Sequence, residues 1–170
     1  MRAMQLRVAF DADPVTAFPL IADFARYPSL ADDVRDVRTR PTAAGDRESD
    51  WVMNFRRGIM RWTELETLDE DRLRIDFEQT DGDFEDFRGS WRVCRTFDGA
   101  EVLFEVTYDF GIESLVGIMD PIAERVITRA VCGVLSGLFG EIRVLEGAEA
   151  LTDLAGPIPA HATAIPTGGN

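Results

Sequence analysis

The hydrophobic period of this chain changes once, near Gly111, and that change limits the folds it can adopt. Before it, apolar residues recur at every second position in successive segments, as in strands that bury one face. Strands are predicted near 4–10, 47–56, 59–68, 72–80, 84–96 and 101–111, with one more before Gly45. Asp81-Gly82 and Asp98-Gly99 are strong hairpin signals between them. Such a series indicates an antiparallel meander.

After Gly111 the apolar residues follow a helical period, and residues 118–147 are predicted to form one long helix that starts near Asp120-Pro121. Its apolar positions span more than half of the circumference, which is wider than a surface helix needs; they are Val126, Ile127, Ala130, Val131, Val134, Leu135, Leu138, Ile142 and Leu145. Two short helices are predicted after the first strand. Asp13-Pro14 supplies an N-cap and a first-turn proline, and the second helix ends at Tyr27-Pro28.

Two carboxylates interrupt an otherwise apolar strand face. Reading every second residue of one strand gives Met60, Trp62, Glu64, Glu66 and Leu68. Burying a carboxylate is costly unless it is paired or protonated, so a face of this kind is more typical of a pocket than of a core. In the rival phase the inward set is Arg61, Thr63 and Leu65, with the glutamates on an exposed face. The glutamate phase is favoured because it keeps Trp62 inside.

Charge and composition exclude several classes of function. A net charge of −13 over 170 residues disfavours binding to nucleic acid or to an anionic membrane surface. The longest uncharged apolar stretch, 130–140, is too short to span a bilayer. No secretory signal opens the chain, and Cys94 and Cys132 have no metal or redox spacing. A reduced, cytoplasmic compartment is therefore expected.

The single histidine, His161, lies in the C-terminal tail. This removes Ser-His-Asp and Cys-His catalysis from the core, together with His-rich metal sites. No Gly-rich phosphate loop precedes a helix. The predicted organisation is one ligand-binding domain over residues 1–150, followed by a flexible tail over 151–170 that is rich in Ala, Gly, Pro and Thr.

Three stretches resemble one known superfamily. Residues 18–28 are similar to the "ADxxxYP" segment of the polyketide cyclase and coenzyme Q-binding branch of the START/Bet v 1-like superfamily. Gly82-Asp83-Phe84 with residues 87–91 resembles the "GPF…LxGxW" hairpin of that branch, and Arg61-Trp62-Thr63 resembles the "WTS" strand of bacterial aromatase/cyclases. The resemblance covers about residues 4–145. It implies an α+β helix-grip fold, in which a curved antiparallel sheet wraps a long C-terminal helix around a hydrophobic cavity.

The resemblance also implies a function, with departures at the site. In the aromatase/cyclases an arginine on the strand after the Trp-Thr pair helps to polarise carbonyls, and the matching position here is Glu66. A polar residue on the last strand of the sheet, His in some members, matches Tyr108. We therefore expect Glu66, assisted by Glu64 and Tyr108, to act in acid–base chemistry. Structural readings are the alternatives: an exposed, ion-paired strand face for the glutamates and a core hydroxyl for the tyrosine.

The expected function is cyclisation or dehydration of a hydrophobic, oxygenated small molecule in secondary metabolism, without a metal or redox cofactor. The substrate is free or presented by an acyl carrier protein, and the protein is a monomer or homodimer without stable membrane insertion. One alternative is a non-catalytic carrier of a quinone or lipid, and another is a protein-interaction role. The residues expected to bind the ligand share one face of each strand: Trp51, Met53, Phe55, Trp62, Phe77, Phe87, Trp91 and Phe104.

Overall fold

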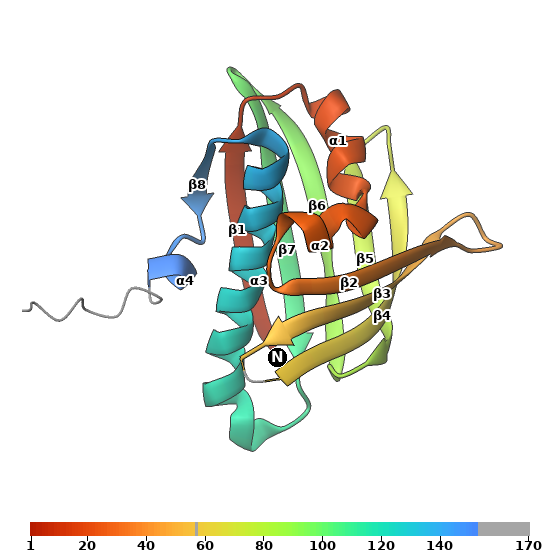
Figure 1. The fold of residues 1–170 in the computed structure, drawn as a ribbon, viewed down its shortest axis with the longest axis vertical. Coiled ribbons are helices and arrows are strands. Elements are labelled where there is room, and N and C mark those ends of the chain that lie inside the picture. Colours follow the sequence, from red (N-terminus) through yellow and green to blue (C-terminus); the bar gives the residue numbers. More distant parts are fainter. Residues whose placement is uncertain (57, 153–170) are drawn as a thin grey trace, which may run out of the picture.

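One strongly curved antiparallel sheet forms most of the structure, a computed structural model that describes residues 1–56 and 58–152. The sheet contains β1 (Arg2–Phe10), β2 (Val34–Pro41), β3 (Arg47–Phe55), β4 (Gly58–Asp69), β5 (Arg74–Gly82), β6 (Asp86–Thr96), β7 (Gly99–Asp109) and β8 (Ile142–Glu146). The order across it is β2-β3-β4-β5-β6-β7-β1-β8. Strands β2 and β3, with the first part of β4, run almost crosswise to β1, β6 and β7, which gives the sheet a concave face (Figure 1).

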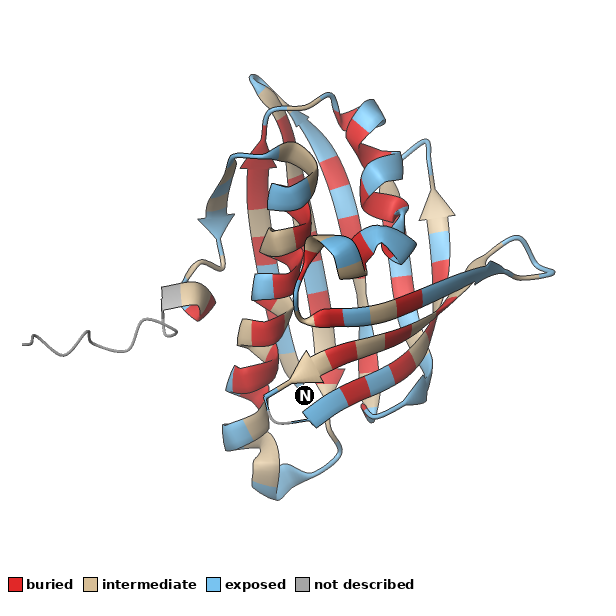
Figure 2. Ribbon diagram, viewed as in Figure 1, coloured by how far each residue is buried: buried red, intermediate tan, exposed pale blue. Residues whose placement is uncertain are grey.

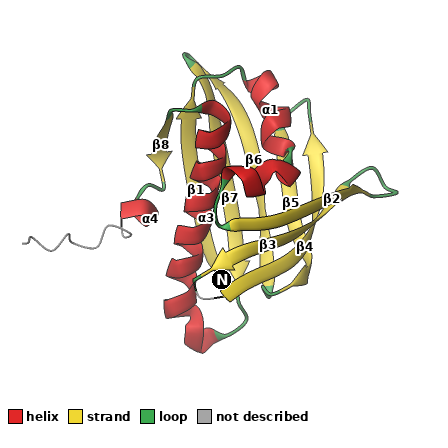
Figure 3. Ribbon diagram, in the orientation of Figure 1, coloured by secondary structure: helices red, strands yellow, loops and turns green. Residues whose placement is uncertain are grey.

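Helices cover that concave face and follow the last strand. They are α1 (Pro14–Ala22), the 3₁₀ helix η1 (Phe24–Arg26), α2 (Tyr27–Leu30), the 3₁₀ helix η2 (Glu113–Leu115), α3 (Val116–Phe139) and α4 (Glu149–Thr152). Figure 3 shows α1, α2 and α3 on the same side of the sheet, with α4 next to β8 at the edge of the sheet. The Asp13 carboxylate caps α1, as predicted, by accepting bonds of 3.1 Å from the backbone N–H groups of Val15 and Thr16. The predicted arrangement, one long helix across a curved sheet, is confirmed.

Burial alternates along the strands, because successive side chains point to opposite faces of the sheet. Figure 2 shows this alternation as bands of buried and exposed residues. The register places large apolar side chains opposite one another on the concave face: Trp51 faces Trp62, and Trp91 faces Phe104. The buried core therefore lies between this face and the helices.

The long helix differs from its predicted bounds at both ends. It begins at Val116, so Pro121 lies inside it, and it ends at Phe139 rather than near residue 147. Gly140 takes a φ of +79°, which a side chain disfavours, and this conformation ends the helix. The chain then turns back as β8, where Ile142 pairs with Phe10 and Val144 with Val8. Over so few residues an apolar pattern fits a strand as well as a helix.

Two smaller predictions also change or fall outside the described residues. The second short helix does not end at Tyr27-Pro28 but continues to Leu30, because a proline in a first turn starts a helix well. The predicted tail over 151–170 begins inside α4 (Glu149–Thr152), and its part beyond Thr152, including His161, lies outside the described residues.

Gly82 sets the position of a cavity residue. Its φ is +147°, and a Cβ there would lie 2.5 Å from the Cα of Trp62. We expect Gly82→Ala to reduce the free energy of unfolding by about 2 kcal/mol, because it adds backbone strain and a clash. Chemical denaturation measures this, with the exposed Gly45→Ala, also at positive φ but with open space around it, as the comparison for strain alone. Equal losses in the two variants would contradict the contact with Trp62.

Candidate active site

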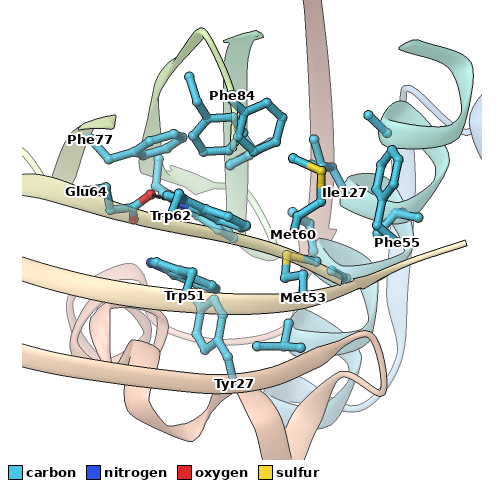
Figure 4. A pocket seen from close by; sticks show the side chains of 18 residues that line it. Tyr27, Trp51, Met53, Phe55, Met60, Trp62, Glu64, Phe77, Phe84 and Ile127 are labelled. Carbon is cyan, nitrogen blue, oxygen red and sulfur yellow. Dashed lines mark hydrogen bonds between the residues drawn. The ribbon is translucent and has the colours of Figure 1, made fainter. Parts of the chain in front are cut away.

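A narrow cavity lies between the concave sheet face and α3. Its wall is almost entirely apolar and aromatic, and consists of Tyr27, Val34, Trp51, Met53, Phe55, Met60, Trp62, Glu64, Phe77, Phe84, Phe87, Trp91, Phe104, Ala123, Val126, Ile127, Ala130 and Val131. Figure 4 shows Trp51 and Trp62 side by side, with Glu64 beside the indole of Trp62. The volume is about 70 Å³, enough for a few water molecules. Pockets that hold drug-sized ligands measure roughly 300–1,000 Å³, so a multi-ring ligand requires the wall to move.

All eight residues predicted to bind the ligand lie on this wall. That they bind a ligand stays a prediction. The prediction omitted Val34 and Met60 from the strands, Tyr27 from α2, Phe84 from the β5–β6 connection and the five α3 residues. Met60 could have been added because it shares the alternation of Trp62. The others depend on how the helices and the β5–β6 connection fold back over the sheet, which alternation within a strand does not encode.

The phase of β4 is the one that places both glutamates inside. Glu64 is 3 % exposed and Glu66 is fully buried, whereas Arg61 on the other face is exposed. Trp62 stays inside on the same face and stacks on Trp51 with ring centres 5.6 Å apart. The favoured prediction for this strand is therefore confirmed.

Glu64 is the carboxyl side chain that the described cavity wall contains. The indole N–H of Trp62 donates a 2.8 Å hydrogen bond to its Oε2 atom. Burial raises the pKa of this carboxyl well above its usual value, and the neighbouring negative charge of Glu66 raises it further, against the opposing effect of the indole N–H groups. Glu64 therefore holds its proton at a pH where an exposed glutamate has lost it.

Glu66 has a different environment, although it lies only two residues away. It pairs with Arg47, which stands opposite it on β3. Arg47 is held on two further sides: it donates a 2.5 Å bond to the carbonyl oxygen of Ala22, and its guanidinium lies 4.5 Å from the ring centre of Phe24. Glu66 is not part of the cavity wall. The structure therefore brings Glu64, and not Glu66, to the cavity, which corrects the expected placement of Glu66, while the catalytic role of either glutamate stays a prediction.

Polar atoms without partners gather around this carboxyl pair. Within residues 1–56 and 58–152, four buried side-chain atoms have no hydrogen-bond partner: Arg47 Nη2, Ser49 Oγ, Trp51 Nε1 and Glu66 Oε1. Ser49 stands opposite Glu64, between Arg47 and Trp51 on the same face of β3. Buried polar groups without partners destabilise a fold by about 1–3 kcal/mol each. These four atoms lie on the facing strands β3 and β4, around the Glu64–Glu66 pair.

Tyr108 is not part of the cavity wall, which corrects the prediction that placed it there with the glutamates. Its side chain is buried, and its hydroxyl donates a 2.8 Å bond to the carbonyl oxygen of Asp120 in α3. A contact of this kind, between the sheet and the helix, is not encoded in the alternation of one strand. These contacts fit the alternative interpretation, in which Tyr108 is a core residue whose hydroxyl binds the backbone.

We expect Tyr108→Phe to lower the free energy of unfolding by about 1 kcal/mol, because one buried hydrogen bond is lost. Ligand binding and any catalytic rate should not change. Thermal denaturation and ligand titration measure the two effects. A loss of rate without a loss of stability would show that the Tyr108 hydroxyl takes part in catalysis.

Tyr27 is the phenol that the cavity wall does contain. Its hydroxyl donates a 2.5 Å bond to the carbonyl oxygen of Ile21. Burial raises the pKa of Tyr27 well above its ordinary value. It therefore stays neutral, and its proton is already used in a backbone bond that ties α2 to α1.

Within the described ranges, no cluster of three or more His, Cys, Asp or Glu side chains is arranged to hold a metal ion. A helix with both the length and the apolar character needed to cross a bilayer is likewise not found in the described part of the chain.

Comparisons with known proteins place this fold. Three solved structures share it: a protein of Thermus thermophilus (TTHA0849), the Zhui aromatase/cyclase of Streptomyces sp. R1128 and a START superfamily protein of Mycobacterium smegmatis. Their TM-scores are 0.69, 0.68 and 0.67, and their identities are 22%, 16% and 10%. The alignments cover 88%, 90% and 81% of this chain and 99%, 95% and 95% of the others. At these identities the likeness shows the fold, and the helix-grip prediction is confirmed.

A search of curated proteins gave no match. The model of one protein family, described as "Polyketide cyclase / dehydrase and lipid transport", matches residues 10–134. The match includes β2 to β7, the three short helical segments before β2 and most of α3, and so contains all of the cavity wall. This chain therefore belongs to the polyketide cyclase/dehydrase and lipid transport family of the START/Bet v 1-like superfamily.

Proposed function

We propose that this protein binds a hydrophobic, oxygenated small molecule in its aromatic cavity and promotes its cyclisation or dehydration by acid–base chemistry. One observation carries the proposal: a buried carboxyl, Glu64, whose pKa burial raises well above its usual value, faces a cavity whose wall is otherwise apolar and aromatic. A carboxyl of raised pKa is suited to general acid catalysis near neutral pH. The family, and the aromatase/cyclase among the similar structures, support this class of reaction.

The proposed chemistry needs one proton donor close to the ligand. In an aldol-type dehydration the hydroxyl leaves as water after it receives a proton, and the neighbouring carbon loses a proton to a base. Glu64 gives its proton to the departing oxygen, and its carboxylate then accepts the proton from carbon, so the carboxyl returns to its starting state. The aromatic wall holds flat conjugated intermediates by stacking and keeps water away from them.

A second candidate function is carriage of a quinone or lipid without chemistry. Apart from Glu64 and the bonded hydroxyl of Tyr27, the described wall offers the ligand only apolar and indole groups. Such a wall binds an apolar ligand without acting on it. The family description includes lipid transport as well as cyclisation.

A reconstituted polyketide synthase that makes a linear poly-β-ketone tests the proposal. Adding the wild-type protein should shift the products toward cyclised and dehydrated compounds. Ala130→Phe fills the cavity from α3 and should remove the effect, whereas Ser136→Phe on the exposed side of α3 should retain it. Identical products with and without the protein would reject the catalytic function. Saturable quenching of tryptophan fluorescence by a hydroxyanthraquinone, lost in Ala130→Phe, would then favour carriage.

A further inference from the structure

The two buried glutamates share one small space but not one role. They project from the same face of β4, with Glu64 at the cavity wall and Glu66 behind it. Two carboxylates this close in a water-poor interior cannot both ionise at low cost, so the pair retains a proton near neutral pH. Which of the two keeps that proton decides whether the cavity contains a donor.

We propose that Arg47 is a positioning residue, which holds Glu66 in its ionised form and so keeps the proton of the pair on Glu64, the carboxyl that faces the cavity. The inference rests on the proposed function only in giving that proton a use. The ion pair between Arg47 and Glu66, across the β3–β4 ladder, carries it. Arg47 does not face the cavity, so it acts through Glu66 and not on the ligand.

The position of Arg47 is fixed by contacts that do not involve the carboxyls. The backbone of Ala22, at the end of α1, accepts one of its N–H groups, and the ring of Phe24 lies against its guanidinium. Only 19 % of its side chain is exposed, so solvent screens its charge weakly. The positive charge therefore stays beside Glu66, while Glu64 receives its hydrogen bond from the neutral indole of Trp62.

The other elements packed around Glu64 add little charge. From α2, Tyr27 faces the pair as a neutral phenol, and Asp23 lies before it in the chain. On β5, Phe77 and Gln79 stand opposite Glu66 and Glu64. The α3 residues on the wall are all apolar. The positive charge near the two carboxyls is therefore that of Arg47, and it lies beside Glu66.

Carbon-13 NMR of glutamate carboxyls, without any ligand, tests the inference directly. The wild-type protein should show one buried carboxyl protonated at neutral pH, and the indole N–H signal of Trp62 should follow its titration. Glu66→Gln removes the like charge and leaves Arg47 uncompensated, so the titration of Glu64 should move to lower pH by about one unit or more. An unmoved titration would overturn the inference.

Variants of Arg47 separate charge from shape. Arg47→Met should leave both carboxyls protonated at neutral pH, whereas Arg47→Lys should keep a single protonated carboxyl, as in the wild type. The matched control is Arg40→Met, which removes an exposed arginine paired with Glu48 and Asp50 on the same sheet and should change nothing. If the lysine variant behaves like the methionine variant, the positive charge of Arg47 is not what keeps Glu66 ionised, and the inference is overturned. If Arg47→Met does not fold, Glu66→Gln and Arg47→Lys decide the question.

This titration and the test of function can fail independently. If no product changes in the reconstituted synthase but the Glu64 titration shifts as described, the proposed function is wrong and the role of Arg47 stands. If the products change but the titration does not respond to Glu66→Gln, the proposed function stands and the role of Arg47 is wrong.

Discussion

Glu64→Gln should lower the rate of product formation by about 10²-fold or more, the usual effect of losing a general acid–base group. Glutamine keeps the shape of the side chain and can still accept the bond from the Trp62 indole, but it cannot transfer a proton. Ligand affinity should therefore change little. The measurement is the rate and identity of products in the reconstituted synthase, together with the dissociation constant from tryptophan fluorescence.

The control for this variant is Glu78→Gln, which changes an exposed glutamate on β5 and should retain the wild-type rate. Glu66→Gln should act differently again, by moving the pH dependence of the rate rather than removing the proton donor. A Glu64→Gln variant with an unchanged rate and unchanged products would reject Glu64 as the catalytic group and move the carrier function to first place.

The free energy of unfolding should fall as the pH rises above the ordinary glutamate pKa of 4.5, by up to about 1.4 kcal/mol per pH unit. The pKa of Glu64 is raised in the folded state from an ordinary value of 4.5. Below that value the carboxyl is protonated in both states, and no dependence arises. Above it the unfolded chain releases the proton while the folded protein keeps it, so rising pH favours the unfolded state until the raised folded pKa is reached.

Glu64→Gln provides the comparison, because glutamine does not titrate. Both proteins are unfolded with urea between about pH 5 and pH 7. The free energy of unfolding of the wild type should fall as the pH rises, and that of the variant should lack this fall. Asp13, Asp50 and Asp109 have lowered pKa values and change stability in the opposite direction, but only as the pH falls below their ordinary value of 3.8. Parallel pH profiles for the two proteins would show that Glu64 is ionised in the folded state.

The position of the positive charge departs from what the resemblance to the aromatase/cyclases implies. That resemblance implies an arginine at the strand position of Glu66. Here Glu66 faces Arg47 on the neighbouring strand, so the charge is set back from the cavity wall. Under the proposed function the ligand then meets the carboxyl of Glu64, a proton donor that an arginine cannot replace, because a guanidinium does not release its proton.

The small volume of the cavity requires motion on binding. About 70 Å³ is open in this structure, so a ligand of several rings must displace side chains of the wall. Met53 and Met60 line the cavity opposite α3, and unbranched methionine side chains rearrange at low cost. The Trp51–Trp62 stack, with planes 3° apart, is the more rigid part of the wall beside Glu64.

The amino-acid sequence alone determines the strands, their order and the face of each that turns inward. Alternation places Trp51, Trp62 and Glu64 on one side because the side-chain period of a strand is fixed by its backbone geometry. It also predicts eight aromatic and methionine residues of the cavity wall. It fails after Gly140, where a short apolar run fits two periods and only pairing with β1 makes it a strand.

The tertiary structure decides the roles within the site. Glu64 lines the cavity, whereas Glu66 pairs with Arg47, which lies 19 residues before it and becomes its partner only through the β3–β4 register. The hydroxyl of Tyr108 is taken by a carbonyl of α3, a contact that requires the helix to pack back on the sheet. Periodicity is a local property of the chain, whereas the charge state of a buried group depends on neighbours that only folding brings within reach.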